Sequence, residues 1–231
     1  MKTVDIKDLL ENAVHFGHKT SKWNPKMRNM LFTEHQGIHI FDLTKTKSHL
    51  ERALDFLKKA TSEGKVVLFV GTKPQAMKII EDSAKICNMP FVSKDWIPGL
   101  LTNFSTVSRR IEYLRNLKAE RDENDFDKYT KKEGSILRKT IDKLEASLGG
   151  LISMRSVPDV VFIADCVRNR LAVKEAKKMK IAIVGIVDSN ADPDPITYPI
   201  PGNDDALKSL TYLIGKVTEA VSEGRKPAPK L

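Results

Sequence analysis

The chain has 231 residues, 41% of them hydrophobic, so it can bury a core and is not a disordered chain. Its formal net charge of +9 favours a polyanionic partner, because each neutralised phosphate releases counterions, and leaves RNA, DNA and anionic membrane open. Aromatic residues make up only 6%, which argues against a module that grips single strands by stacking bases on exposed rings.

The longest apolar runs are short. "VVLFV" from Val66 and "IAIVGIV" from Ile181 fall well below the ~20 residues that span a bilayer, and the N-terminus lacks the continuous apolar stretch of a secretory signal. We therefore expect a cytosolic protein. Cys87 and Cys166 are far apart and belong to no CxxC pair, which indicates free buried thiols.

The first quarter of the chain is predicted to contain a short helix, a loop, two extended pieces and a second helix. Apolar residues at helical spacing predict a short amphipathic helix over residues 5 to 14. The acid-free stretch "HFGHKTSKWNPKM", His15 to Met27, follows as a loop. Two short extended pieces around Gly37 come next, and then a helix that ends near Gly64.

Strand-turn-helix units fill the rest of the α/β pattern. "KVVLFVGTKPQAMKIIEDSAKI" predicts the first, a second begins at Pro158, a third strand is "IAIVGIVDSN", and the last helix runs from Asp205 to Val221. Short continuous apolar runs that alternate with helices indicate parallel strands covered on both faces. The sequence thus predicts an α/β fold with a parallel sheet.

A charged segment, residues 104 to 148, interrupts this pattern. Its apolar residues step by three and four, which predicts two helices that pack as an antiparallel coiled-coil hairpin: Val107, Ile111 and Leu114 in the first, and Leu137, Ile141, Leu144 and Leu148 in the second. We expect a discontinuous α/β domain (1–103 and 149–225), the inserted hairpin (104–148) and a flexible basic tail (226–231).

Two turns carry residues that suit a binding site. "FVGTKPQA" lies between a strand and a helix but contains neither GxGxxG nor GxxxxGK[ST], so ordinary turn chemistry is the favoured interpretation. Asp188 follows a predicted strand, at the edge where open α/β sheets gather their sites. Asp204 and Asp205 are interpreted by default as the N-cap and first-turn acid of the last helix.

The His15 to Met27 stretch permits two interpretations. The spacing of its histidines, together with His35 and His39, does not by itself assemble a zinc site. Hydrogen-bonded histidines without a metal are therefore favoured. Its basic residues form the sharpest unopposed basic cluster and surround a tryptophan, which favours a loop that faces RNA: Lys19, Lys22, Trp23, Lys26 and Arg28.

Nine motifs, in order over nearly the whole chain, resemble the small-subunit ribosomal protein two family (the S-two family) of bacterial type. They are "AVHFGHKTSKWNPKM", "IHIFDLTKT", "LFVGTKPQA", "GLLTNFSTV", "FDKYTKKEG", "LEASLGGL", "PDVVFIAD", "IVDSNADPD" and "IPGNDDA". The resemblance implies a flavodoxin-like domain with an inserted helical hairpin. It also implies a non-enzymatic, cytoplasmic constituent of the small ribosomal subunit, bound to ribosomal RNA at the head-body region, that supports assembly and helps to dock ribosomal protein one.

The resemblance and the charge pattern together give candidate site residues. For RNA we expect the cluster above, and around the hairpin base Lys94, Asn103, Arg109 and Arg110. No cofactor is required, but the resemblance implies a possible zinc ion held by His18, Asp188 and Asp205, with Asp204 as a further candidate. The chain departs from the family pattern at Pro74, Ile97, Pro98 and residues 166–170, where partner contacts need not transfer.

Two other functions stay open. An α/β enzyme acting on a phosphorylated small molecule is supported only by the turn at Gly71 and by Asp188. A free RNA-binding regulator would share the basic charge without the ribosome. Neither a membrane nor a small-molecule substrate is the expected partner.

Overall fold

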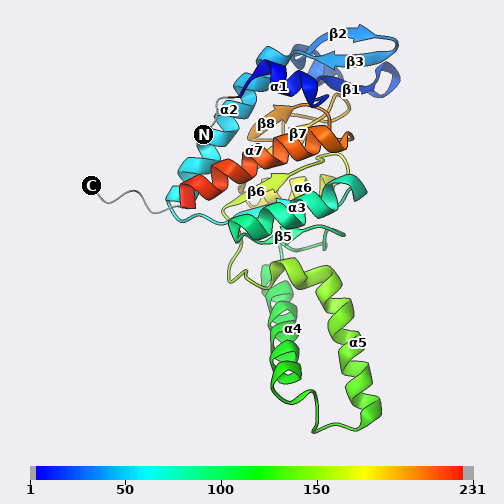
Figure 1. Ribbon diagram of the computed structural model, residues 1–231, viewed down its shortest axis with the longest axis vertical. Coiled ribbons are helices and arrows are strands. Elements are labelled where there is room, and N and C mark those ends of the chain that lie inside the picture. The colour runs from blue at the N-terminus through cyan, green and yellow to red at the C-terminus, as the bar shows by residue number, and fades with distance from the viewer. Residues whose placement is uncertain (1–3, 226–231) are drawn as a thin grey trace, which may run out of the picture.

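A computed structural model describes residues 4–225, and its centre is a parallel β-sheet between helices (Figure 1). The five strands run in the order β5-β4-β6-β7-β8: β4 (Val67–Val70), β5 (Phe91–Val92), β6 (Val160–Ile163), β7 (Ala182–Val187) and β8 (Tyr198–Pro201). Counted along the chain within this sheet, that order is 2-1-3-4-5, the flavodoxin-like arrangement. The predicted fold class is confirmed.

Helices cover both faces of this sheet, which explains why β4 and β6 are buried at every position. One face packs against α1 (Ile6–Glu11), α2 (Leu43–Ser62), α3 (Pro74–Cys87) and α7 (Leu207–Arg225). The other face packs against α6 (Arg170–Lys178), which lies behind the sheet in Figure 1, and against the base of the hairpin. The first of these two cores contains no residue between 104 and 148.

A small antiparallel sheet caps one end of the molecule (Figure 1). Its order is β1-β3-β2, with β1 (Phe16–Lys19), β2 (Leu31–His35) and β3 (Ile38–Phe41). The two extended pieces around Gly37 are therefore confirmed. The expectation of a loop after the first helix is wrong for Phe16–Lys19, because this polar segment gains its regular structure from pairing with β3.

The hairpin projects from the opposite end of the molecule (Figure 1). It consists of α4 (Phe104–Asn124) and α5 (Lys131–Leu148), and a short turn, Gly149–Leu151, returns the chain to the sheet. The apolar residues expected at its seam are buried or half-buried, as their spacing requires. Thr130 and Glu133 form a capping box that fixes the start of α5. Coiled-coil packing of the two helices and the division of the chain into domains stay predictions.

The start of α7 corrects one interpretation. The Asn203 side-chain oxygen, and not an aspartate, accepts from the backbone N–H groups of Asp205 (2.8 Å) and Ala206 (3.0 Å). Asp204 and Asp205 are therefore free to turn toward the sheet edge.

Three expectations concern the chain as a whole. Both cysteines are free and buried, as expected. Across residues 4–225 no helix is both long and apolar enough to cross a bilayer. The expected basic tail, 226–231, lies outside the described residues.

Candidate nucleic-acid interface and ion cluster

The N-terminal basic segment, residues 19–28, is held in place by its backbone. Two short 3₁₀ turns, Thr20–Lys22 and Pro25–Met30, shape it, and Pro25 supplies the fixed φ at the start of the second. The Asn24 N–H donates to the Ser189 carbonyl at 2.7 Å, just beyond β7. The backbone is thus tied to the sheet edge, while Lys19, Lys22 and Arg28 stay exposed.

Lys26 differs from its neighbours. Its Nζ lies 2.9 Å from Asp192 Oδ2 and also pairs with Asp194, and hydrogen bonds to Asp194 and Asp192 raise the Lys26 pKa. The expectation of an unopposed cluster is therefore wrong at this position. These aspartates lie 166 and 168 residues away along the chain, so no local sequence pattern announces them.

Trp23 is packed against the protein on one side. Its ring centroid lies 5.0 Å from that of His39, and its side chain is half-buried. Because the two rings meet at a tilt of 44°, the contact with His39 orients the indole, and only part of its surface stays available to a partner.

The residues expected around the hairpin base are all exposed: Lys94, Asn103, Arg109 and Arg110. Asn103 stands immediately before α4, where its Oδ1 accepts from the Thr106 hydroxyl at 3.1 Å. Arg109 and Arg110 project from the first turns of α4, which places their charges beside the α/β domain.

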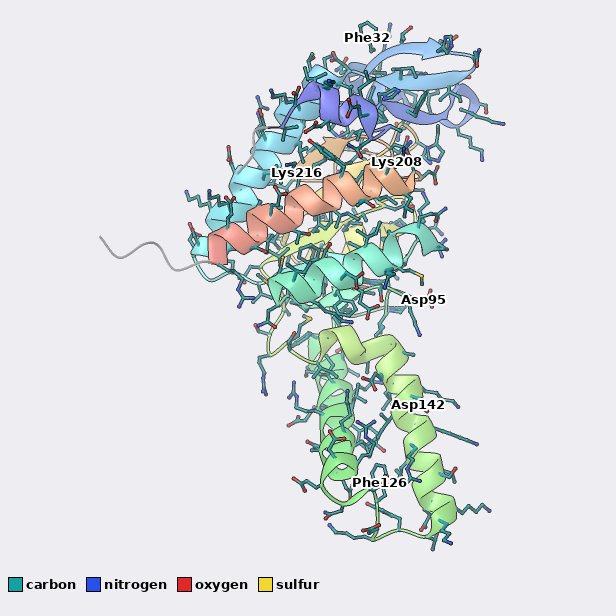
Figure 2. All side chains as sticks on the ribbon, in the orientation of Figure 1. Phe32, Asp95, Phe126, Asp142, Lys208 and Lys216 are labelled. Atoms are coloured by element: carbon teal, nitrogen blue, oxygen red, sulfur yellow. The ribbon has the colours of Figure 1, made fainter. Side chains whose placement is uncertain are left out.

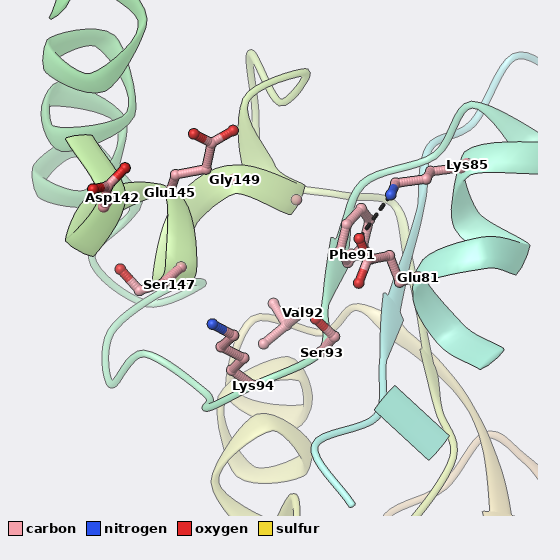
Figure 3. A pocket seen from close by; sticks show the side chains of 12 residues that line it. Glu81, Lys85, Phe91, Val92, Ser93, Lys94, Asp142, Glu145, Ser147 and Gly149 are labelled. Atoms are coloured by element: carbon pink, nitrogen blue, oxygen red, sulfur yellow. Dashed lines mark hydrogen bonds and ion pairs between the residues drawn. The ribbon is translucent and has the colours of Figure 1, made fainter. Parts of the chain in front are cut away.

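Lys94 borders a pocket of about 530 Å³ between α3, β5 and the end of α5 (Figure 3). The charged residues that line it are three acids and two lysines: Glu81, Asp142, Glu145, Lys85 and Lys94. Glu81 is already bonded to Lys85 at 2.7 Å. This mixed lining makes the pocket a poor site for a phosphate, so Lys94 is a weaker candidate for RNA contact than Lys19, Lys22 or Arg28.

Glu175, which the sequence analysis missed, fixes the segment that leads into the hairpin. Its carboxylate accepts from Trp96 Nε1 (3.1 Å), from the backbone N–H groups of Gly99 (2.8 Å), Leu101 (3.1 Å) and Thr102 (3.2 Å), and from the Thr102 hydroxyl (3.2 Å). Burial opposes ionisation of this 6%-exposed side chain, but these donors outweigh it and lower the pKa. These hydrogen bonds hold α6 against residues 96–102.

A cluster of charges, here the sheet-edge cluster, occupies the carboxyl ends of β4, β6 and β7. It contains His18, Lys73, Asp165, Asp188, Asp204 and Asp205. Lys73 Nζ lies 2.8 Å from Asp204 and 3.4 Å from Asp165. His18 Nδ1 lies 3.0 Å from Asp188 Oδ1, and its Nε2 lies 3.3 Å from Asp205 Oδ2.

These contacts shift the titration of the cluster. The hydrogen bond to Asp188 raises the pKa of His18, although burial works against it. Burial, with the charges of Asp188 and Asp165, raises the pKa of Asp204 to about 7 in spite of the adjacent Lys73. Burial disfavours a charged Lys73, but its carboxylate partners outweigh that effect and raise its pKa.

The cluster brings together three groups that could hold a small cation, but they are not the three that the sequence predicts. Ligand atoms of His18, Asp188 and Asp204 lie within 4.8 Å of one another, whereas Asp205 approaches the other nitrogen of the same imidazole. One ion bound through His18 Nδ1 would therefore meet Asp188 and Asp204, not Asp205. Lys73 already supplies a positive charge to Asp204, which competes with such an ion.

The same cluster occupies the place where a flavodoxin-like sheet ordinarily receives a ligand, between β4 and β6. Lys73, from the "GTKP" turn, points its ammonium at the protein's own aspartates. A Cβ added at Gly71 would lie 2.6 Å from Ile80 Cγ1, so this glycine permits close packing of α3 on β4. The geometry gives no support to the alternative of an enzyme for phosphorylated substrates.

Comparison with known proteins extends over nearly the whole chain. The family model described as "Ribosomal protein S2" matches residues 9–224. The chain is 46% identical over 226 residues to the small ribosomal subunit protein uS2 of Petrotoga mobilis, which covers 98% of this chain and 78% of that protein. It is 46% identical over 224 residues to uS2c of Cyanophora paradoxa (97% and 96%) and 47% identical over 225 residues to uS2 of Dictyoglomus turgidum (97% and 92%).

Proposed function

The chain belongs to the ribosomal protein S2 family, a structural and non-enzymatic component of the small ribosomal subunit, and from this we propose that it holds ribosomal RNA through two basic regions. One is the N-terminal basic segment, and the other is the hairpin base with Asn103, Arg109 and Arg110. Contacts of this kind go mainly to phosphate and sugar, so they position the protein and do not read bases.

One observation carries the proposal. Residues 12 to 33 contain no acid, and Lys19, Lys22 and Arg28 form no ion pair with any described residue. Their backbone is nevertheless fixed by the 3₁₀ turns and by the bond from Asn24 to Ser189. Fixed, unpaired cations bind phosphate without first breaking an internal ion pair.

The test removes these charges. We expect the K19Q/K22Q/R28Q variant to enter small subunits more weakly and to bind their RNA with a smaller salt dependence, by about 0.7–0.9 in the logarithmic slope for each lost contact. K26Q should have less effect, since Asp192 and Asp194 already neutralise Lys26. A K7Q/K78Q/K85Q variant, which loses the same charge from α1 and α3, is the control. Equal behaviour of the two triple variants would overturn the proposal.

Docking of ribosomal protein one forms the second part of the proposal, and an exposed aromatic side chain on the small sheet supports it. Phe32 is 76% exposed and projects from β2 at the outer end of the molecule (Figure 2). Phe16 is 42% exposed and pairs in register with Ile40 on the same small sheet. Large apolar side chains that stay exposed on a charged protein suit a contact with another protein.

Substitution of Phe32 tests this part. We expect Phe32→Ser to reduce the amount of ribosomal protein one that co-sediments with small subunits, while the variant itself is still incorporated. Ile86→Ser, at an equally exposed position on α3, should leave co-sedimentation unchanged. Unchanged co-sedimentation with Phe32→Ser would contradict the assignment.

A zinc ion held by His18, Asp188 and Asp204 completes the proposal, since nitrogen and carboxylate oxygen are ordinary zinc ligands. Through the ion, His18 on β1 would be joined to Asp188, just after β7, and to Asp204, in the turn before α7. Elemental analysis of the purified chain should find zinc that His18→Asn removes and that His35→Asn, at an exposed position on β2, leaves in place. Wild-type protein without zinc, or the same content in both variants, would contradict it.

A further inference from the structure

The exposed side of α6 and its flanks carries basic charge alone. Six exposed residues are lysine or arginine: Arg168, Arg170, Lys174, Lys177, Lys178 and Lys180. The single acid between positions 167 and 181 is Glu175, which is buried and bonded to residues 96–102. We call these six residues the α6 basic face.

This pattern differs from that of the other helices. Every other described helix of eight residues or more exposes at least one acid, and their lysines often pair with it, as Lys78 does with Asp82 on α3. No salt bridge joins a member of the α6 basic face to any residue between 4 and 225. Asp192 and Asp194, the acids in the pocket that adjoins this face, already pair with Lys26, so the face keeps an excess of positive charge.

The spacing arranges these charges in a row. Arg170, Lys174 and Lys177 are four and three residues apart, so they lie along one stripe of the helix. The stripe is about 10 Å long at 1.5 Å per residue. A row of this length can contact consecutive phosphates of one RNA strand.

The α6 basic face also joins the two regions of the proposed RNA interface. A pocket of about 510 Å³ lies between α6 and the N-terminal basic segment, and its charged lining is Lys26, Arg170, Lys174 and Lys177 against Asp192 and Asp194. From the middle of α6, the Glu175 carboxylate accepts hydrogen bonds from residues 96–102, directly before the hairpin base. α6 thus contacts the N-terminal basic segment through this pocket and the segment before the hairpin base through Glu175.

We propose that the α6 basic face binds the phosphate backbone of structured small-subunit RNA and connects the two basic regions into one continuous interface. The inference rests on the proposed function, because it takes ribosomal RNA as the partner. No aromatic side chain is exposed between positions 167 and 181, so base stacking contributes nothing here. Binding depends on charge and on the shape of the RNA backbone.

The experiment compares two charge-matched variants of the full-length chain. R170Q/K174Q/K177Q removes the row on α6, and K7Q/K78Q/K85Q removes equal charge from exposed positions of α1 and α3. Binding to naked small-subunit RNA is measured between about 50 and 200 mM salt. We expect the α6 variant to lose about 2 in the logarithmic salt slope and at least about tenfold in affinity, well beyond the control.

The outcomes separate this inference from the proposed function. If the α6 variant binds like the control while K19Q/K22Q/R28Q binds weakly, the α6 inference fails and the proposed function stands. If K19Q/K22Q/R28Q binds normally and only the α6 variant is weak, the proposed N-terminal contact fails alone. If the α6 variant binds naked RNA normally but enters subunits poorly, the partner of this face is a protein, which also overturns the inference.

Discussion

Glu175 is a buried charge whose contacts satisfy it almost completely. Each of its carboxylate oxygens accepts bonds from the segment 96–102, so the charge is stabilised by a ring of donors and needs no cationic partner. Removing such an acceptor leaves several buried N–H groups unsatisfied, and each costs about 1–3 kcal/mol. The carboxylate thereby determines the path of the chain into α4.

Glu175→Gln should lower the free energy of unfolding at neutral pH by about 2–4 kcal/mol, because an amide offers one acceptor oxygen in place of two. Since folding lowers the Glu175 pKa, its contribution is present above the ordinary value of 4.5 and is lost as the pH falls through the lower folded value. Urea denaturation from pH 7 to acid should therefore show the difference between wild type and variant shrinking. Glu112→Gln, on the exposed side of α4, should behave as wild type, and a constant difference at all pH values would refute this account.

The role of a charged residue could be predicted where it depends on neighbours in the sequence. It could not be predicted where its partner lies far away along the chain. The lysines of the N-terminal segment could be read directly, because no acid interrupts them. The sequence predicts only ordinary turn chemistry around Lys73, because its partner Asp204 comes 131 residues later. Glu175 does have one local signal: it falls on the buried phase of α6, between Val173 and Ala176.

Among the elements, those with apolar runs or helical periodicity were predicted, and β1, β5 and β8 were missed. β4, β6 and β7 are continuous Val/Ile/Phe runs, and α2 and α7 show helical periodicity. β5 has two residues, and β8, "YPIP", contains two prolines that argue against a strand, which an edge position tolerates. β1 was missed because its pairing with β3 depends on tertiary contact.

Gly150 shows what holds the hairpin return against edge strand β5. A Cβ added there would collide with the Phe91 carbonyl oxygen, a backbone atom that cannot move aside. We expect Gly150→Ala to destabilise the protein by about 1–3 kcal/mol. Gly215→Ala, in α7 with open space around the position, should instead stabilise it by about 0.5–1 kcal/mol. Thermal unfolding checks both, and a neutral Gly150→Ala would contradict the predicted collision.

The hairpin should be separable from the core that packs against α1, α2, α3 and α7. Because that core takes no residue from 104–148, replacing residues 112–140 with a short Gly-Ser turn should leave the parallel sheet folded. Val107 and Leu148, which help to cover the other face, are retained. Hydrogen exchange should still show protected amides in β4 and β6. Exchange as fast as in the unfolded chain would show instead that the two parts fold as one.

At the scale of the whole molecule, a continuous RNA interface requires that the hairpin hold one direction relative to the α/β domain. The N-terminal segment and the hairpin base are far apart in sequence, and rigid RNA can meet both only if their relative position is fixed. The structure fixes it through Glu175 and through the packing of Gly150 on β5. A preorganised arrangement loses less conformational entropy on binding than a mobile one.

Spin labels at Lys128, in the hairpin tip, and at Lys78, on α3, test this directly, since both side chains are exposed. The native cysteines are buried and burial raises their thiol pKa values, so they react slowly with the label. Pulsed electron-electron distance measurements should give one narrow distribution in the wild-type background and a broader one with Glu175→Gln. Glu112→Gln should leave the distribution narrow. A broad wild-type distribution would mean that RNA, and not the protein's own contacts, sets the direction of the hairpin.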